Sequence, residues 1–75
     1  MFYFTTIENT SRNYTPAALI YEYAKKHFYK TFYYYDSLRI SIAGIVYKYD
    51  HWNITKHENS TETVKIYLKR VKKGE

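Results

Sequence analysis

The sequence contains no cysteine, only two glycines and only one proline. Without cysteine the protein has neither disulfide bonds nor a thiolate zinc site, and its three histidines are too scattered to replace one. A chain of 75 residues forms at most one small domain, which buries a limited share of its surface. Such domains are commonly stabilised by disulfides, a metal or self-association. We therefore expect no cofactor, and we expect stability to come from dense packing of large side chains or from a partner chain.

Long apolar runs are missing as well. No stretch approaches the roughly 18 apolar residues of a membrane-spanning helix, and the first residues lack the basic and apolar regions of a signal peptide. The Asn-x-Ser/Thr triplets that begin at Asn9, Asn13, Asn53 and Asn59 are then turn sequences rather than glycosylation sites. These features predict a cytoplasmic protein that does not contact a membrane.

Catalytic motifs are also lacking. The chain has no cysteine nucleophile, no glycine-rich phosphate loop and no His-Glu-x-x-His sequence. Asp36 and Asp50 stand beside turn-forming residues, where aspartate is common. His51 and His57 share a face of an alternating strand, but no third metal ligand accompanies them. We therefore expect neither an enzyme nor a metal site.

Aromatic residues are abundant by contrast. Eleven tyrosines, four phenylalanines and one tryptophan make up 21% of the chain. Each aromatic side chain can bury about 150–250 Å², so a few of them suffice for a small core and the rest must lie on the surface. Surface tyrosine is enriched in recognition patches. The aromatic surplus therefore predicts a binding protein, and it also favours self-association as a homodimer.

Positive charge is concentrated at one end of the chain. Residues 1–64 carry a net charge of +1, whereas residues 65–75 carry +4. The latter comes from Lys65, Lys69, Arg70, Lys72 and Lys73 against a single glutamate. These five residues could contact phosphate groups of a nucleic acid. They could equally prevent aggregation at a sheet edge and solubilise the chain end.

The clearest structural signal is a helix start at Thr15-Pro16. Threonine is a good N-cap, and proline is favoured at the first helical position. We predict a helix over about 16–30, preceded by a strand over 2–7. Its predicted buried face consists of Ala17, Ile20, Tyr21, Ala24 and Phe28.

The remainder of the chain alternates in the manner of strands. Residues 31–35 are strongly β-prone, and we predict strands over 38–42, around Trp52–Thr55 and over 64–69. The alternation changes phase at Gly44, which indicates a β-bulge there. The expected fold is α+β, with one helix packed on a small antiparallel sheet in the order β-α-β-β-β. Residues 1–75 form a single domain whose basic C-terminus begins at about residue 70.

The tyrosine run at 33–35 is the leading binding candidate. Alternation sends Tyr33 and Tyr35 to one face and Tyr34 to the other. The run could be ordinary core and surface, a protein-binding hot spot, or a platform for stacking bases. The surrounding residues are not strongly basic, which favours protein binding over nucleic-acid binding. The predicted protein-binding residues are Tyr33, Tyr34, Tyr35, Tyr47 and Tyr49.

Composition also points to an origin. Residues with AT-rich codons total 36, and those with GC-rich codons total 10. In length and composition the chain resembles the small early proteins with which low-GC phages take over their host. The resemblance implies a phage-type inhibitor that binds and blocks a host replication, transcription or defence protein. The alternative is a small basic nucleic-acid-binding protein that uses its C-terminal Lys/Arg segment and surface tyrosines.

Overall fold

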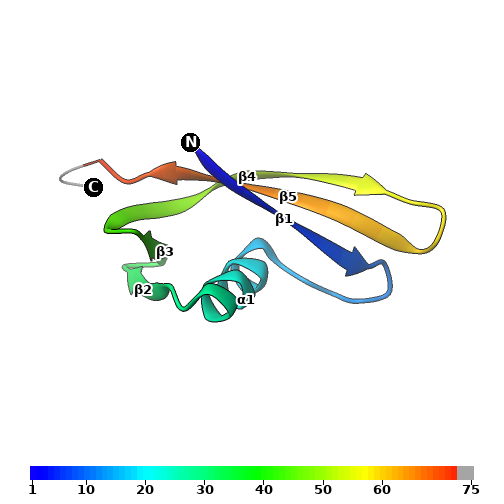
Figure 1. Ribbon diagram of the computed structural model, residues 1–75, viewed down its shortest axis with the longest axis horizontal. Helices are drawn as coiled ribbons and strands as arrows, with labels where there is room; N and C mark the ends of the chain where they lie inside the picture. The colour runs from blue at the N-terminus through cyan, green and yellow to red at the C-terminus, as the bar shows by residue number, and fades with distance from the viewer. Residues whose placement is uncertain (73–75) are drawn as a thin grey trace.

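In the computed structural model, which describes residues 1–72, one helix lies against one face of a five-stranded antiparallel sheet (Figure 1). The strands are β1 (Phe2–Asn9), β2 (Lys30–Tyr34), β3 (Ser37–Ile42), β4 (Ile45–Lys56) and β5 (Thr61–Arg70). Helix α1 (Pro16–His27) connects β1 to β2. The strand order is β1-β5-β4-β3-β2. The predicted α+β fold is confirmed, with four strands after the helix rather than three.

Helix α1 begins where the sequence predicts it. Thr15 is extended, its Oγ1 accepts a hydrogen bond from the Ala18 N–H at 3.1 Å, and Pro16 follows at the first helical position. The helix ends at His27, three residues before the predicted end. Phe28 adopts a left-handed conformation with φ of 60°, and the Tyr29 N–H donates to the Ala24 carbonyl at 2.8 Å. This hydrogen bond closes the helix, as in a Schellman motif.

The early end of α1 corrects part of the predicted helix face. Ile20 and Ala24 are buried as expected, but Phe28 is 96% exposed and Tyr21 is also exposed. Phe28 leaves the helix, so helical spacing no longer decides which way its side chain faces. Leu19 is fully buried although the sequence analysis did not place it in the core. The sheet bends around α1, which buries a wider stripe of the helix than one flat face would (Figure 1).

The predicted bulge at Gly44 is wrong. Ala43 and Gly44 form a two-residue turn between β3 and β4, with φ of 52° and 81°. Positive φ at both positions is what a type I′ hairpin turn requires. The bulge lies instead at Asp50, where the β4–β5 register shifts between Tyr49 and His51. Strand β4 runs through it for 12 residues and pairs with β3 and then with β5 along its length.

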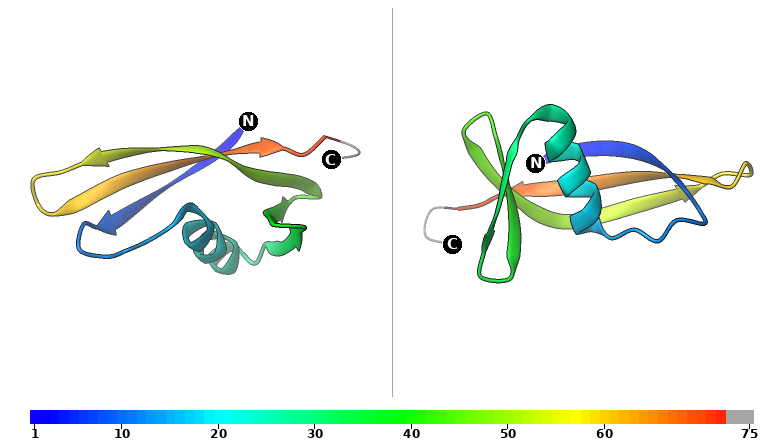
Figure 2. Two further views of the ribbon diagram at one scale, coloured as in Figure 1. Left: turned by 180° about the vertical axis from the view of Figure 1, so that it is seen from behind. Right: turned by 90° about the horizontal axis from the view of Figure 1, so that it is seen from below.

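The core lies between α1 and the sheet. Every second residue of interior strand β5 faces the helix, and Val64, Ile66 and Leu68 are fully buried there. The Phe4 ring stacks on Tyr23 of α1, with ring centroids 4.0 Å apart. Residues at the alternate positions of β1, β5 and the second half of β4 point to the opposite side. We call this side the outer face; α1 does not cover it (Figure 2).

The β2–β3 hairpin extends away from the rest of the sheet. It crosses the direction of β1 and β5, as the right-hand view of Figure 2 shows. Four of the five residues of β2 are exposed, because this strand is an edge and pairs only with β3. The molecule is correspondingly elongated, with extents of 44 × 22 × 20 Å. The hairpin therefore presents its side chains to solvent on several sides.

Candidate functional site

A groove separates the start of α1 from the β2–β3 hairpin. It has a volume of about 850 Å³, and we call it the hairpin groove. Residues 15–17 and Ile20 form one wall, residues 33–39 form the other, and Tyr49 of β4 also lines it. Its location follows from the crossing of the hairpin over the end of the sheet. A smaller cleft of about 320 Å³ lies beside Tyr21, Tyr29 and Thr31.

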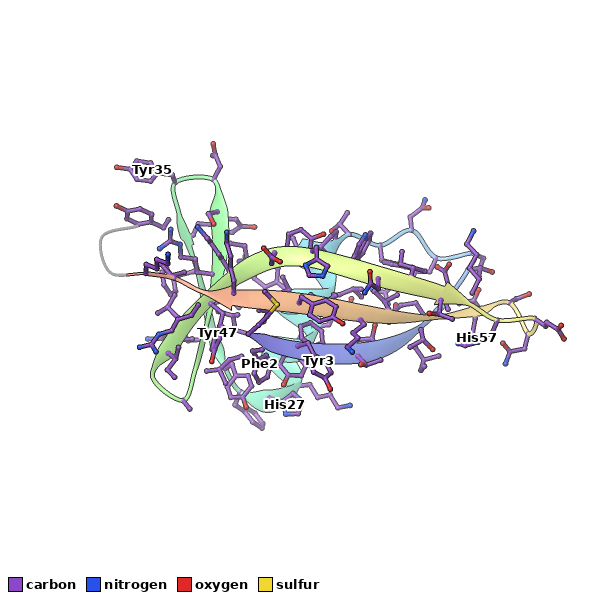
Figure 3. All side chains as sticks on the ribbon, turned by 90° about the horizontal axis from the view of Figure 1, so that it is seen from above. Phe2, Tyr3, His27, Tyr35, Tyr47 and His57 are labelled. Atoms are coloured by element: carbon purple, nitrogen blue, oxygen red, sulfur yellow. The ribbon has the colours of Figure 1, made fainter. Side chains whose placement is uncertain are left out.

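The hairpin groove gathers four of the five tyrosines predicted to bind protein. Tyr33, Tyr34, Tyr35 and Tyr49 all line it, and all four are exposed. Tyr47 does not line it. It faces the helix side of the sheet, half-buried beside Phe2, with the two ring centroids 5.5 Å apart. Figure 3 shows Tyr35 at the hairpin tip, far from Tyr47 and Phe2.

Tyr35 occupies the tip at a conformational cost. It is the first residue of the two-residue turn between β2 and β3, and its φ is 56°. A left-handed conformation costs a residue with a Cβ about 1–2 kcal/mol, so glycine or asparagine would suit this position better. The side chain is 86% exposed, and burial in the core does not offset that cost. Exposed aromatic side chains in strained backbone are typical of functional surfaces.

Neighbouring side chains hold the groove tyrosines in place. The Arg39 guanidinium carbon lies 4.5 Å from the centre of the Tyr34 ring, at cation–π distance. Arg39 lies on β3 of the hairpin and is itself buried. On the other face, a hydrogen bond with Tyr33 raises the pKa of Tyr21 on α1. The aromatic walls of the groove are therefore tied both to the sheet and to the helix, which lowers the entropic cost of binding.

The predicted basic residues do not form one patch. Lys65 and Lys69 lie on the outer face, whereas Arg70 pairs in register with Tyr47 and faces the helix side. Lys72 is exposed beyond the end of β5, after Val71 donates a hydrogen bond to the Val46 carbonyl at 2.9 Å. Lys73 lies outside the described residues. Among the predicted basic residues within 1–72, Lys65 and Lys69 therefore share one face of the sheet.

The outer face holds a row of rings that the sequence analysis missed. His51, Tyr67 and Tyr3 come from β4, β5 and β1 and lie opposite one another in the strand registers. The His51 and Tyr67 rings are stacked with centroids 4.3 Å apart, and Tyr67 and Tyr3 are 5.7 Å apart. Alternation in each strand could have placed each ring on one side of the sheet. Only the pairing of strands far apart in sequence could place the three side by side.

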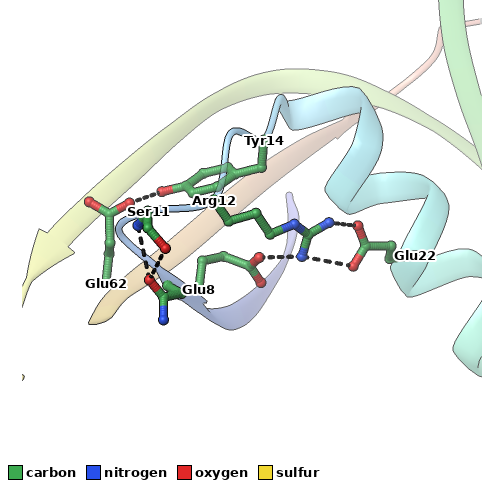
Figure 4. Close-up of polar contacts among 7 residues, drawn as sticks. Glu8, Ser11, Arg12, Tyr14, Glu22 and Glu62 are labelled. Atoms are coloured by element: carbon green, nitrogen blue, oxygen red, sulfur yellow. Dashed lines mark hydrogen bonds and ion pairs between the residues drawn. The ribbon is translucent and has the colours of Figure 1, made fainter. Parts of the chain in front are cut away.

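A network of polar contacts connects the end of β1 and the following loop to α1 and β5 (Figure 4). Arg12 forms ion pairs with Glu22 of α1 and, at 2.7 Å, with the buried Glu8 of β1. Tyr14 donates a hydrogen bond to the buried Glu62 of β5. Burial, followed by this hydrogen bond, raises the pKa of Tyr14 to about 12. Since these contacts join β1, the following loop, α1 and β5, we assign the network a stabilising role.

Within the described residues, neither His51 nor His57 belongs to a cluster that could bind a metal ion. His51 Nδ1 lies 2.6 Å from an Asp50 carboxylate oxygen, and His57 Nε2 lies 2.6 Å from the Thr63 hydroxyl. Within residues 1–72, His, Asp and Glu side chains form no group of three that could hold a metal ion. The same part of the chain has no helix with the length and apolar character needed to cross a membrane.

Comparisons of the chain with protein-family models, curated proteins and solved structures found no match. Functional inference therefore rests on the side chains themselves. Two surfaces stand out, and they lie on different parts of the fold. One is the hairpin groove with its tyrosines, and the other is the outer face with its row of rings.

Proposed function

We propose that this protein is a non-enzymatic inhibitor that binds a host protein through the hairpin groove and thereby blocks it. The observation that carries the proposal is the gathering of Tyr33, Tyr34, Tyr35 and Tyr49 around one groove, with Tyr35 in a strained conformation at its tip. None of these four residues belongs to the buried core. Their placement is explained by contact with a partner.

Tyrosine is well suited to such a contact. Its ring supplies a large rigid area, its hydroxyl supplies a hydrogen bond, and it has few rotatable bonds to immobilise. Hot spots for protein binding are enriched in tyrosine and lie in pockets that exclude water. The groove, at about 850 Å³, has room for several side chains of a partner, such as those on a protruding loop or helix. Its walls are mainly aromatic and aliphatic, which favours a partner with an apolar protrusion.

The host setting rests on composition. The excess of residues with AT-rich codons and the small size resemble those of low-GC phage early proteins. We therefore propose action in the cytoplasm of the host cell on its replication, transcription or defence machinery. The net charge of +5 argues against mimicry of DNA, which requires an acidic surface. We propose instead that the protein inhibits its partner by occupying one of the partner's working surfaces.

Capture from the lysate of a low-GC bacterium tests the proposal. The wild-type protein is compared with Tyr35→Gly, which removes the tip side chain and relieves its positive φ. A matched control is Phe28→Gly, because Phe28 is also highly exposed at positive φ but lies outside the groove. We expect Tyr35→Gly to weaken capture about 30-fold, equivalent to about 2 kcal/mol. Phe28→Gly should capture the same protein as the wild type.

Removal of residues 72–75 separates steering from contact. Charges at a rim mainly raise the association rate, so this deletion should weaken capture only modestly. Equal losses for Tyr35→Gly and Phe28→Gly, or no loss for Tyr35→Gly, would contradict the assignment of the groove.

A further inference from the structure

The outer face combines aromatic rings from three adjacent strands. His51, Tyr67 and Tyr3 lie opposite one another in the registers of β4, β5 and β1, and Figure 3 shows Tyr3 on β1. The side chains of His51 and Tyr3 are more than half exposed, although each ring also contacts Tyr67. A row of this kind offers π surface to planar groups that stack, and every nucleobase has such a surface.

Positive charge accompanies the rings. The Lys65 ammonium lies 4.2 Å from the centre of the Tyr3 ring and 5.1 Å from that of Tyr67. A hydrogen bond with Tyr67 raises the pKa of Lys65. Lys69 lies on the same side of β5, two residues beyond Tyr67 in the sequence. Lys65 and Lys69 therefore place two cations on β5, one on each side of the row of rings. A chain of phosphates could run past both positions.

Negative charge is nearly absent from this side of the sheet. Among residues 1–72, the carboxylates lie on the helix side of the sheet, on α1, in turns or at the bulge. The single carboxylate beside the row is Asp50 at the bulge, and its oxygen lies 2.6 Å from His51 Nδ1. The other outward positions near the row carry Thr5, Asn53 and Thr63, which can donate and accept hydrogen bonds. Ring surface, cations and neutral polar groups thus occur together.

We propose that the outer face binds single-stranded nucleic acid, with bases against the His51–Tyr67–Tyr3 row and phosphates at Lys65 and Lys69. Charge complementarity selects a polyanion, and the ring row selects one whose bases are unpaired. A duplex keeps its bases stacked on one another and would meet the cations alone. The surface is separate from the hairpin groove, so this activity goes beyond the proposed protein contact.

Fluorescence anisotropy with the full chain tests this proposal. The probes are labelled single strands of about 12 nucleotides, one of DNA and one of RNA, together with a duplex of the same sequence. We expect both single strands to bind, or one of them, and more tightly than the duplex. The affinity should fall with salt at a log–log slope of about −1.4, because each phosphate contacted by single strands contributes about −0.7.

Substitutions separate stacking from charge. Tyr3→Ala should weaken single-strand binding at least about fivefold at constant salt slope, since loss of one stacked ring costs that much or more. Lys69→Gln should reduce the magnitude of the slope by about 0.7. Both side chains are exposed on the outer face, and circular dichroism will show that the variants fold. Tyr35→Gly, in the hairpin groove, should bind the single strand as the wild type does.

Three results would overturn the inference. The first is no single-strand binding by the wild type at low salt. The second is equally tight binding of the duplex or of heparin, which would mean that charge alone decides affinity. The third is an unchanged affinity in Tyr3→Ala. A preference for RNA over DNA, or the reverse, would support the inference and identify which nucleic acid is bound.

Discussion

Strands β5 and β2 show how position in a sheet decides whether the large side chains of a strand are buried or exposed. In β5, every second residue from Glu62 to Leu68 is buried, because β1 and β4 flank the strand and α1 covers one side. In β2, only Thr31 is even half-buried, because the strand is an edge that projects with its hairpin. In an interior strand, alternation therefore buries every second side chain. In an edge strand, the large side chains stay on the surface.

The comparison separates stability from binding within one small domain. The aliphatic side chains of β5 hold the sheet to the helix, and the tyrosines of the β2–β3 hairpin line the groove. A binding side chain on an edge strand can be substituted to suit a different partner at little cost in the free energy of folding. The following predictions test how sharply these two roles divide.

The largest effect is expected in the core. Ala24 of α1 is buried, so Ala24→Asp places a carboxylate without a partner in an apolar interior. Such burial costs several kcal/mol, against a total free energy of unfolding of roughly 5–15 kcal/mol for a small domain. We expect the variant to be unfolded by circular dichroism. Lys26→Ala, on the exposed side of the same helix, is the control and should stay folded; a folded Ala24→Asp would contradict the described core.

The polar network should rank next. Arg12→Ala leaves the buried Glu8 carboxylate without its ion pair and breaks the link to Glu22 of α1. We expect urea denaturation to show a free energy of unfolding lower by about 1–3 kcal/mol. Arg12→Lys keeps the charge and should lose less. If Arg12→Ala unfolds at the wild-type urea concentration, the network is not needed to hold the loop between β1 and α1.

Self-association would reduce the difference in side-chain burial between β5 and β2, since a second copy could cover the β2 edge and its tyrosines. The exposed aromatic surface and the lack of disulfides motivate a homodimer. Sedimentation at tens of micromolar should give twice the 9.2 kDa mass of the chain. Each tenfold dilution should then lower the apparent free energy of unfolding by up to about 1.4 kcal/mol per dimer. A monomer mass at this concentration would remove the dimer.

Alkaline pH should weaken the network by a smaller amount. The folded protein holds the Tyr14 proton more tightly than the unfolded chain, because its pKa rises from 10.0 to about 12. The resulting stabilisation is complete below pH 10 and is lost as the pH rises toward 12. We expect Tyr14→Phe to lose less stability than the wild type over this interval in thermal melts. Parallel pH profiles for the two proteins would argue against the Tyr14–Glu62 hydrogen bond.

The smallest effect on stability is expected at the hairpin. Tyr33 is 57% exposed, so Tyr33→Ala should change the free energy of unfolding by no more than about 0.5 kcal/mol. The same substitution should weaken partner binding by about 2 kcal/mol if the groove is the contact. Ile66→Ala in β5 provides the contrast, with an expected loss of about 2–5 kcal/mol in stability. A large loss of stability in Tyr33→Ala would mean that the hairpin also supports the fold.

Local sequence accounts for much of the fold. Thr15 and Pro16 specify the start of α1, because one side chain satisfies a free N–H and the other lacks one. Alternation over 64–69 identifies the buried side of β5, because side chains of a strand point to opposite faces in turn. The helix start and the alternation depend only on residues that are close together in the sequence, within one helical turn or one strand.

Other features required the tertiary structure. The end of α1 at Phe28, the turn at Gly44 and the bulge at Asp50 depend on how the chain must direct β2 and β4 to pair with their neighbours. The burial of Tyr47 depends on contact with Phe2, which is distant in sequence. The row of His51, Tyr67 and Tyr3 depends on the register of three strands. Strand register is set by packing across the whole sheet, and a shift of one residue would move every ring to the other face.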